Sequence, residues 1–118
     1  EGYFRNQESR ALEEISKTNN RVVATGGGTV LRQENISLMR RSGKTVFLEA
    51  SLEVLWERVR SKKDRPLLKA GDPRENLERI LSERKILYEQ ACDFRVNTDA
   101  GTPDQVAQNI LERLEKNQ

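Results

Sequence analysis

The sequence of 118 residues contains no histidine and only one cysteine, Cys92. Without histidine there is no Ser-His-Asp or Cys-His catalytic group and no zinc site of the HExxH type, and the most common general base is missing. A single cysteine excludes an internal disulfide and a CxxC metal site. It also favours a reducing compartment, so we expect a cytoplasmic protein.

Long apolar runs and a strong excess of charge are missing too. No run approaches the about 20 residues that a membrane-spanning helix needs, and the first ten residues, EGYFRNQESR, lack the apolar core of a signal peptide. The net charge is only +2, so we expect neither a membrane nor a nucleic acid as partner. What is abundant is arginine, with 14 of the 21 basic residues, whose fork of donors suits carboxylates and phosphates.

The hydrophobic pattern alternates between helix and strand along the whole chain. It predicts strands over 21–25, 44–50 and 94–98, separated by helices over 3–18, 33–41 and 51–61, a helix that begins after Asp72, and a last one that begins after Thr102. This order predicts an α/β fold, a parallel sheet with helices on both faces. Three strands are few, and the chain begins inside a helix. We therefore interpret residues 1–118 as one domain that lacks its N-terminal part.

Three consecutive glycines, Gly26, Gly27 and Gly28, end the first predicted strand in the stretch VVATGGGTV. Ligands of open α/β sheets bind at the carboxyl ends of strands, and backbone without side chains suits close approach. On the glycines alone, a ligand seat and a tight turn from strand to helix are equally well supported. The stretch is not a P-loop, because the spacing GxxxxGK[ST] occurs nowhere in the chain.

Four stretches in order carry a resemblance to a known family: GYFRNQE, ATGGGTVL, DRPLLKAGDP and ERKILYEQACDFRVNTD. Together they resemble shikimate kinase, from Phe4 to the last predicted helix. The resemblance implies a P-loop NTPase fold of the nucleoside monophosphate kinase type. It implies a monomer that transfers the γ-phosphoryl group of ATP, with Mg²⁺, to the 3-hydroxyl of shikimate, on the chorismate route to aromatic amino acids.

The resemblance also implies roles for individual residues. Shikimate would be bound by Arg5, Arg84 and the three glycines, where arginine forks can pair its carboxylate and bare amides can bond its hydroxyls. Arg65 lies in the loop over 62–73, which resembles the family's lid, and would stabilise the transferring phosphate. Arg58 and Pro103 would lie on either side of the adenine ring. Taken singly, each of these side chains has an ordinary interpretation, a surface charge or the first residue of a helix.

The chain also departs from the family pattern. Ile86 stands where the family usually has proline. The family's first strand, its P-loop with lysine and Ser/Thr, and the second strand with an aspartate all precede the FR pair, and none is in this sequence. The first strand of the family lies between those matching 21–25 and 44–49, and the Mg²⁺ ligands are expected in the same missing part. We therefore expect these 118 residues alone neither to fold stably nor to turn over.

Two alternatives stay open at this point. Another small-molecule kinase of the same fold, such as a gluconate kinase, would share the architecture. A short, non-catalytic helical module would explain the missing P-loop but would give Arg5, Arg65 and Arg84 no purpose. Trp56, Tyr88 and Cys92 are expected in the core or at its boundary without chemistry.

Overall fold

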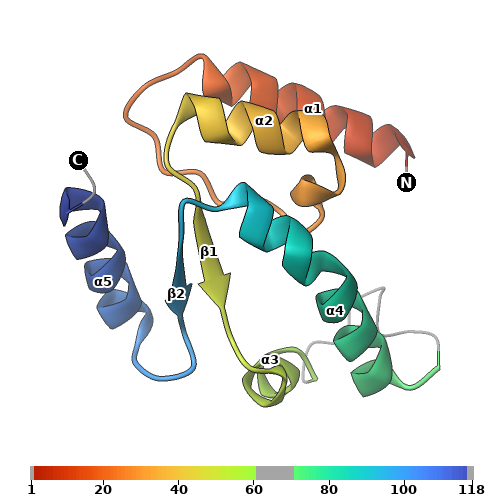
Figure 1. Cartoon of the computed structure of the whole chain (residues 1–118). Coiled ribbons are helices and arrows are strands. Elements are labelled where there is room, and N and C mark those ends of the chain that lie inside the picture. Colours follow the sequence, from red (N-terminus) through yellow and green to blue (C-terminus); the bar gives the residue numbers. More distant parts are fainter. Residues whose placement is uncertain (1, 61–70, 117–118) are drawn as a thin grey trace.

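The computed structural model describes residues 2–60 and 71–116, which form helices around a small parallel sheet (Figure 1). The elements in chain order are α1 (Gly2–Ser16), the 3-10 helix η1 (Thr29–Leu31), α2 (Gln33–Ser42), β1 (Val46–Glu49), α3 (Leu52–Val59), α4 (Pro73–Ala91), β2 (Phe94–Asn97) and α5 (Pro103–Lys116). The predicted helices are therefore confirmed to within two residues at the ends that the structure describes. The 3-10 helix was not predicted.

The sheet consists of β1 and β2, which pair in parallel with Val46 opposite Phe94. Side chains alternate between the two faces of a strand, so Phe47 and Phe94 lie on opposite faces. The ring of Phe47 packs against Tyr88 of α4, and the guanidinium of Arg113 in α5 lies 4.5 Å from the centroid of the Phe94 ring. Helices therefore cover both faces of the parallel sheet, as the sequence predicts.

The predicted strand over 21–25 is wrong: this stretch belongs to no sheet among the described residues. A strand needs a hydrogen-bonded neighbour, and the only sheet partner of β1 in the described part of the chain is β2. Val22, which a sheet face would cover, is fully exposed, and Val23 is 43% exposed. The β-branched pattern of this stretch is real, but nothing in the described residues pairs with it.

Side-chain caps mark the starts of three helices. Asp72 accepts from the backbone N–H groups of Arg74 and Glu75, at 2.9 and 3.2 Å, and Pro73 follows it as the first helical residue. At α5, Thr102 and Gln105 each accept from the other's backbone N–H, the reciprocal arrangement of a capping box. Ser51 caps α3 by accepting from Val54. The predicted starts at Asp72 and Thr102 are confirmed.

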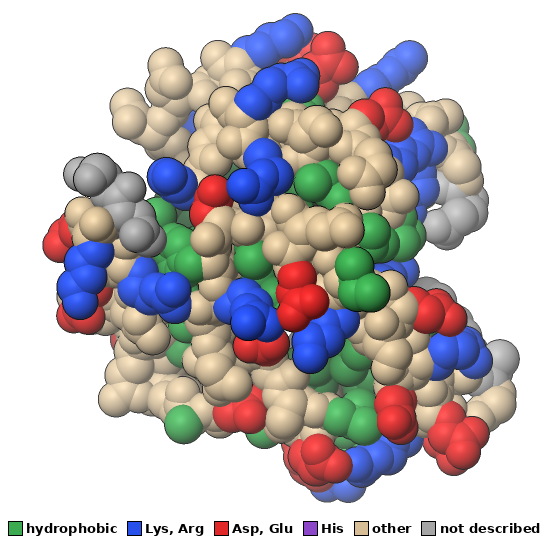
Figure 2. All heavy atoms as spheres, in the orientation of Figure 1, with side chains coloured by type: hydrophobic (Ala, Val, Ile, Leu, Met, Phe, Trp, Pro, Cys, Tyr) green, Lys and Arg blue, Asp and Glu red, His purple; other side chains and the backbone are tan. Residues whose placement is uncertain are grey.

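The buried core is small for a chain of this length. One cluster joins Val30, Ile36 and Ala91, with Met39, Leu87 and Tyr88 packed against it. The accessible surface is 8678 Å², whereas a folded monomer of this mass exposes about 6,600 Å². Figure 2 shows apolar side chains open to solvent between interspersed charges of both signs. Of the helices that the structure describes, none has the length and apolarity to cross a membrane.

Candidate functional site

The three glycines form a turn that leads into η1. The N–H of Thr29 donates to the carbonyl of Gly26 at 3.2 Å, and Leu31 donates to Gly28 at 3.0 Å. None of the three glycines has a positive φ, so the backbone conformation would admit other residues. The reason for glycine must therefore be space.

A particular side chain occupies the space beside each glycine. A Cβ on Gly28 would overlap the guanidinium of Arg5, and one on Gly26 would lie 3.1 Å from a carboxylate oxygen of Glu8. A Cβ on Gly27 would lie 3.2 Å from the hydroxyl of Tyr88 and 3.7 Å from a guanidinium nitrogen of Arg84. Side chains of the chain itself therefore approach the three glycines closely, and the ligand seat that the sequence suggests stays a prediction.

Glu8 links α1 to this turn. One of its carboxylate oxygens pairs with the guanidinium of Arg5 at 2.8 Å, and the other accepts from the hydroxyl of Thr29 at 2.9 Å. Thr29 is 2% exposed, and its carbonyl accepts from the side-chain amide of Asn35, which is equally buried, at 3.0 Å. Because Glu8 is bonded on both oxygens, it fixes Arg5 at the glycine turn. The pair was not predicted, although the spacing of three residues from Arg5 to Glu8 on one helix face is a sequence signal for it.

Arg84 and Tyr88 approach the turn from α4. They are four residues apart and so share one face of the helix. The hydroxyl of Tyr88 donates to the carbonyl of Gly27 at 2.8 Å, and its ring packs on Phe47 with centroids 5.1 Å apart. The sequence predicts Tyr88 in the core or at its boundary without chemistry, and this polar contact is apparent only in the structure. Helix α4 continues without a break past Ile86, whose side chain is 63% exposed.

The guanidinium of Arg84 differs from that of Arg5 in its partners. Arg84 is half-buried, and among the described residues no carboxylate pairs with it and no acceptor bonds it. A half-buried cation without a counter-ion is costly, and an anionic ligand would relieve that cost. The fold thus brings Arg5, Gly26, Gly27, Gly28 and Arg84 to one place, although Arg5 and Arg84 lie far apart in sequence.

The other predicted site residues lie elsewhere or outside the described residues. Arg58 of α3 donates to the hydroxyl and the carbonyl of Thr98, at 3.1 and 2.7 Å, just beyond the end of β2. Pro103 begins α5, five residues after Thr98. Arg58 therefore lies at the carboxyl end of β2, the edge where ligands of such sheets bind. Arg65 and most of the loop over 62–73 lie outside the described residues.

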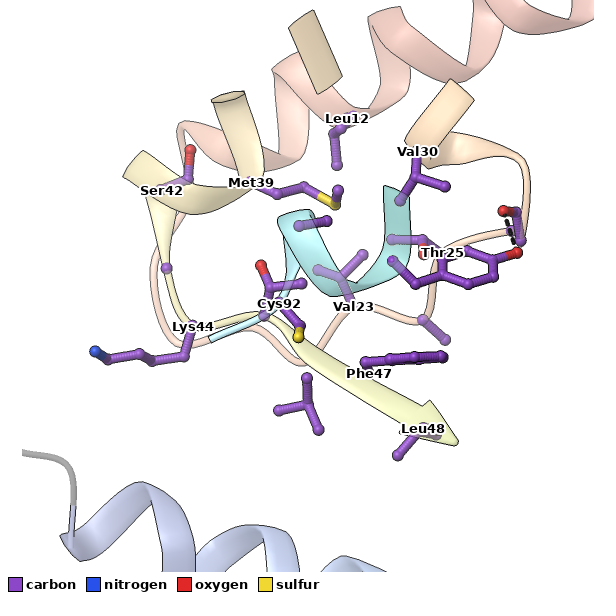
Figure 3. A pocket seen from close by; sticks show the side chains of 18 of the residues that line it. Leu12, Val23, Thr25, Val30, Met39, Ser42, Lys44, Phe47, Leu48 and Cys92 are labelled. Carbon is purple, nitrogen blue, oxygen red and sulfur yellow. Dashed lines mark hydrogen bonds between the residues drawn. The ribbon is translucent and has the colours of Figure 1, made fainter. Parts of the chain in front are cut away.

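A large cavity adjoins the glycine turn. Its volume is about 840 Å³, and its walls include most of the stretch over 18–27, the second half of α4 and the strand β1. Figure 3 shows Leu12, Val30 and Met39 on its helical side and Phe47 and Leu48 on the side of β1. The cavity therefore separates the stretch over 21–25 from β1, which is why the two do not pair.

No three His, Cys, Asp or Glu side chains cluster as a metal site in the described part of the chain. The described residues therefore give no cradle for Mg²⁺. The site as described consists of two guanidinium groups, bare backbone amides, the hydroxyl of Tyr88 and the carboxylate of Glu8, which is already bonded to Arg5 and Thr29. This donor set fits a small molecule that carries a carboxylate and hydroxyl groups.

The chain is similar to proteins of one known family. A family model described as shikimate kinase matches residues 1–115. The chain is 43% identical over 108 residues to a shikimate kinase of Caldicellulosiruptor bescii, covering 92% of the chain and 62% of that relative, and 40% identical to one of Cereibacter sphaeroides, covering 97% and 57%. The chain thus spans about three fifths of the length of these curated relatives.

Two solved structures superpose closely on the fold. One is a shikimate kinase of Acinetobacter baumannii in complex with shikimate, with a TM-score of 0.91, 30% identity, and 98% of this chain and 64% of that chain covered. The other is a shikimate kinase of Bacteroides thetaiotaomicron, with a TM-score of 0.81, 34% identity, and coverage of 98% and 69%. The family match over nearly the whole sequence and the shared fold lead to one conclusion: the chain belongs to the shikimate kinase family.

Proposed function

We propose that the protein carrying this chain is a shikimate kinase, which transfers the γ-phosphoryl group of ATP to the 3-hydroxyl of shikimate on the route to chorismate. The observation that carries the proposal is Arg84, a half-buried guanidinium that has no counter-ion among the described residues and stands beside the glycine turn. The superposed kinase of Acinetobacter baumannii that contains shikimate supports the assignment.

In this proposal Arg84 and Arg5 hold the carboxylate of shikimate, and the glycine turn holds its hydroxyls. Glu8 keeps Arg5 in place through the ion pair of 2.8 Å. Guanidinium groups from two helices orient the substrate, and phosphoryl transfer depends largely on such positioning. Arg58 and Pro103 border the adenine of ATP, and Arg65 stabilises the transferring phosphate. When bound, Mg²⁺ would neutralise charge on the phosphates, with ligands outside these residues.

The cavity supports a further part of the proposal. The relatives have more length than this chain spans, and the free edge of β1 faces the stretch over 21–25 across about 840 Å³. An extended segment from that additional length would supply hydrogen bonds to β1 and cover the apolar side chains of Val23 and Leu48. We propose that the cavity is the place of this strand, and that residues 1–118 are part of one kinase domain.

Steady-state kinetics test the proposed function. The protein that carries this chain is assayed for ADP release with shikimate, gluconate and nucleoside monophosphates, and shikimate is tested for a rise in the unfolding temperature. Arg84→Ala should raise the KM for shikimate at least about tenfold, because the loss of one charge-assisted hydrogen bond weakens binding by about that factor. Arg79→Ala, an exposed arginine of the same helix, is the matched control. An unchanged KM in Arg84→Ala would refute the site, and a preference for gluconate would refute the substrate.

The isolated 118 residues give a separate prediction. Their accessible surface exceeds that of a packed monomer of equal mass by about 2,000 Å². We expect a broad thermal transition and no shikimate-dependent release of ADP. A sharp, cooperative transition together with turnover would contradict this expectation.

A further inference from the structure

The hydroxyl of Tyr88 has no role in the proposed binding of shikimate or ATP. It lies at the glycine turn, where it donates to the carbonyl of Gly27 at 2.8 Å. Its ring is held against Phe47 of β1, with an interplanar angle of 38°. Tyr88 is therefore anchored at two points, one on the sheet and one on the turn.

This hydrogen bond sets the orientation of a peptide plane. The C=O of Gly27 and the N–H of Gly28 belong to the same planar, trans peptide group and point in opposite directions. Fixing the carbonyl toward α4 therefore turns the Gly28 N–H away from Tyr88. Among the described residues, this N–H donates to no partner.

The three glycines permit this orientation of the peptide group but do not fix it. With no side chain at Gly26, Gly27 or Gly28, the peptide between them is free to rotate in the absence of a restraint. The hydroxyl of Tyr88 restrains it, in addition to the backbone hydrogen bond from Thr29 to Gly26, and a Cβ on Gly27 would come within 3.2 Å of this hydroxyl. The tyrosine ring and the bare backbone thus depend on each other.

Arg84 shares this restraint. It lies one helical turn before Tyr88 on the same face of α4, and its guanidinium is within 3.7 Å of the same Cβ position on Gly27. The bond from Tyr88 to Gly27 therefore fixes the distance between the helix that carries Arg84 and the turn on which the substrate would rest. Displacement of either would separate the cation from the backbone donor.

We propose that Tyr88 is a positioning residue of the substrate site: through its hydroxyl it holds the Gly27 carbonyl, aims the Gly28 N–H at the substrate and keeps Arg84 at the turn. The proposal rests on the proposed function, since it names shikimate as the substrate. Tyr88 does not touch the reacting atoms. Its effect is on binding, through the turn.

The test compares Tyr88→Phe with Tyr3→Phe in the protein that carries this chain. Both variants delete one hydroxyl and keep the ring, but Tyr3 is 76% exposed on α1. Tyr88→Phe should raise the KM for shikimate about three- to tenfold, because the loss of one neutral hydrogen bond corresponds to about that factor. The KM for ATP should stay unchanged. Tyr3→Phe should change neither.

A second measurement does not depend on activity. The Thr29 N–H closes the turn on Gly26, and its hydrogen exchange should be several-fold faster in Tyr88→Phe, whereas amides of α5 should keep the wild-type rate. An unchanged shikimate KM, or equal losses for both substrates with faster exchange throughout the protein, would overturn the proposal.

The two proposals fail in different ways. If the wild-type protein neither releases ADP with shikimate nor is stabilised by it, the proposed function fails and the substrate role of Tyr88 fails with it. If the wild type turns over and Tyr88→Phe has the kinetics of Tyr3→Phe, only the role of Tyr88 fails.

Discussion

The guanidinium of Arg5 occupies the position that a Cβ on Gly28 would take. The residue at 28 therefore controls where the guanidinium lies, although the two are 23 positions apart. Since Gly28 has a φ of −87°, alanine would fit the backbone itself. The conflict is confined to the far end of a flexible side chain, which can move away.

Gly28→Ala should therefore damage binding more than folding. We expect a rise of about tenfold or more in the KM for shikimate, because Arg5 loses its place and a charge-assisted hydrogen bond with it. The free energy of unfolding should change by about 1 kcal/mol, because the group that must shift is the end of a flexible side chain and its ion pair with Glu8 is weakened. Gly2→Ala is the matched control, since a Cβ there meets nothing within 4 Å. A large loss of stability with an unchanged KM would contradict this account.

Glu8→Gln should weaken the hold on Arg5 without removing all hydrogen bonds. The amide keeps one acceptor for Thr29 but loses the charge that pairs with Arg5 at 2.8 Å. We expect the KM for shikimate to rise several-fold and the free energy of unfolding to fall by about 1 kcal/mol. Glu14→Gln, whose carboxylate is 77% exposed in a loose pair with Lys17, should leave both quantities unchanged. Equal effects of the two variants would show that Glu8 has no special role.

A substitution at Leu48 tests whether a further strand fills the cavity. It is 56% exposed on β1, close to the 54% of Leu111 on α5. If an extended segment covers β1 in the protein that carries this chain, Leu48→Asp should lower its free energy of unfolding by more than about 2 kcal/mol, because a charge would be buried. Leu111→Asp should cost less than about 0.5 kcal/mol. Chemical denaturation measures both, and equal small losses would refute the proposed filling.

Cys92 should react slowly as a thiol. Burial raises the pKa of Cys92 above its ordinary value, and Asp93 adds to this, against the opposing effects of Arg95, the backbone and Arg40. Alkylation requires the thiolate, so the rate at Cys92 should reach half its maximum at a higher pH than in the denatured chain, where the midpoint is about 8.5.

The same shift has a consequence for stability. Because the pKa of the thiol is higher in the folded state than in the unfolded state, its contribution to stability is fully present below the unfolded value and is lost as the pH rises through the folded one. Cys92→Ser should remove this part of the alkaline loss. A midpoint of the pH dependence of alkylation at or below that of the denatured chain would contradict the burial of the thiol.

Sequence alone determined the local structure and the family. Helix starts at Asp72 and Thr102 follow from side-chain caps, which act over three residues, and the order of helices and strands follows from periodicity. The motifs that carry the resemblance lie in short stretches, so the family was evident before the fold, and the comparisons confirmed it. The strand over 21–25 was predicted wrongly because a strand needs a partner, which local sequence does not reveal.

Tertiary structure decided what the three glycines contact. Their sequence allowed either a turn or a ligand seat, and their φ values show that the conformation did not require glycine. Only the packing of α1 and α4 against the turn brought Glu8, Arg5, Arg84 and Tyr88 to it, across separations of up to 61 residues in the case of Tyr88 and Gly27. Such contacts depend on how whole helices pack, and so the roles of Glu8 and Tyr88 could be seen only in the folded chain.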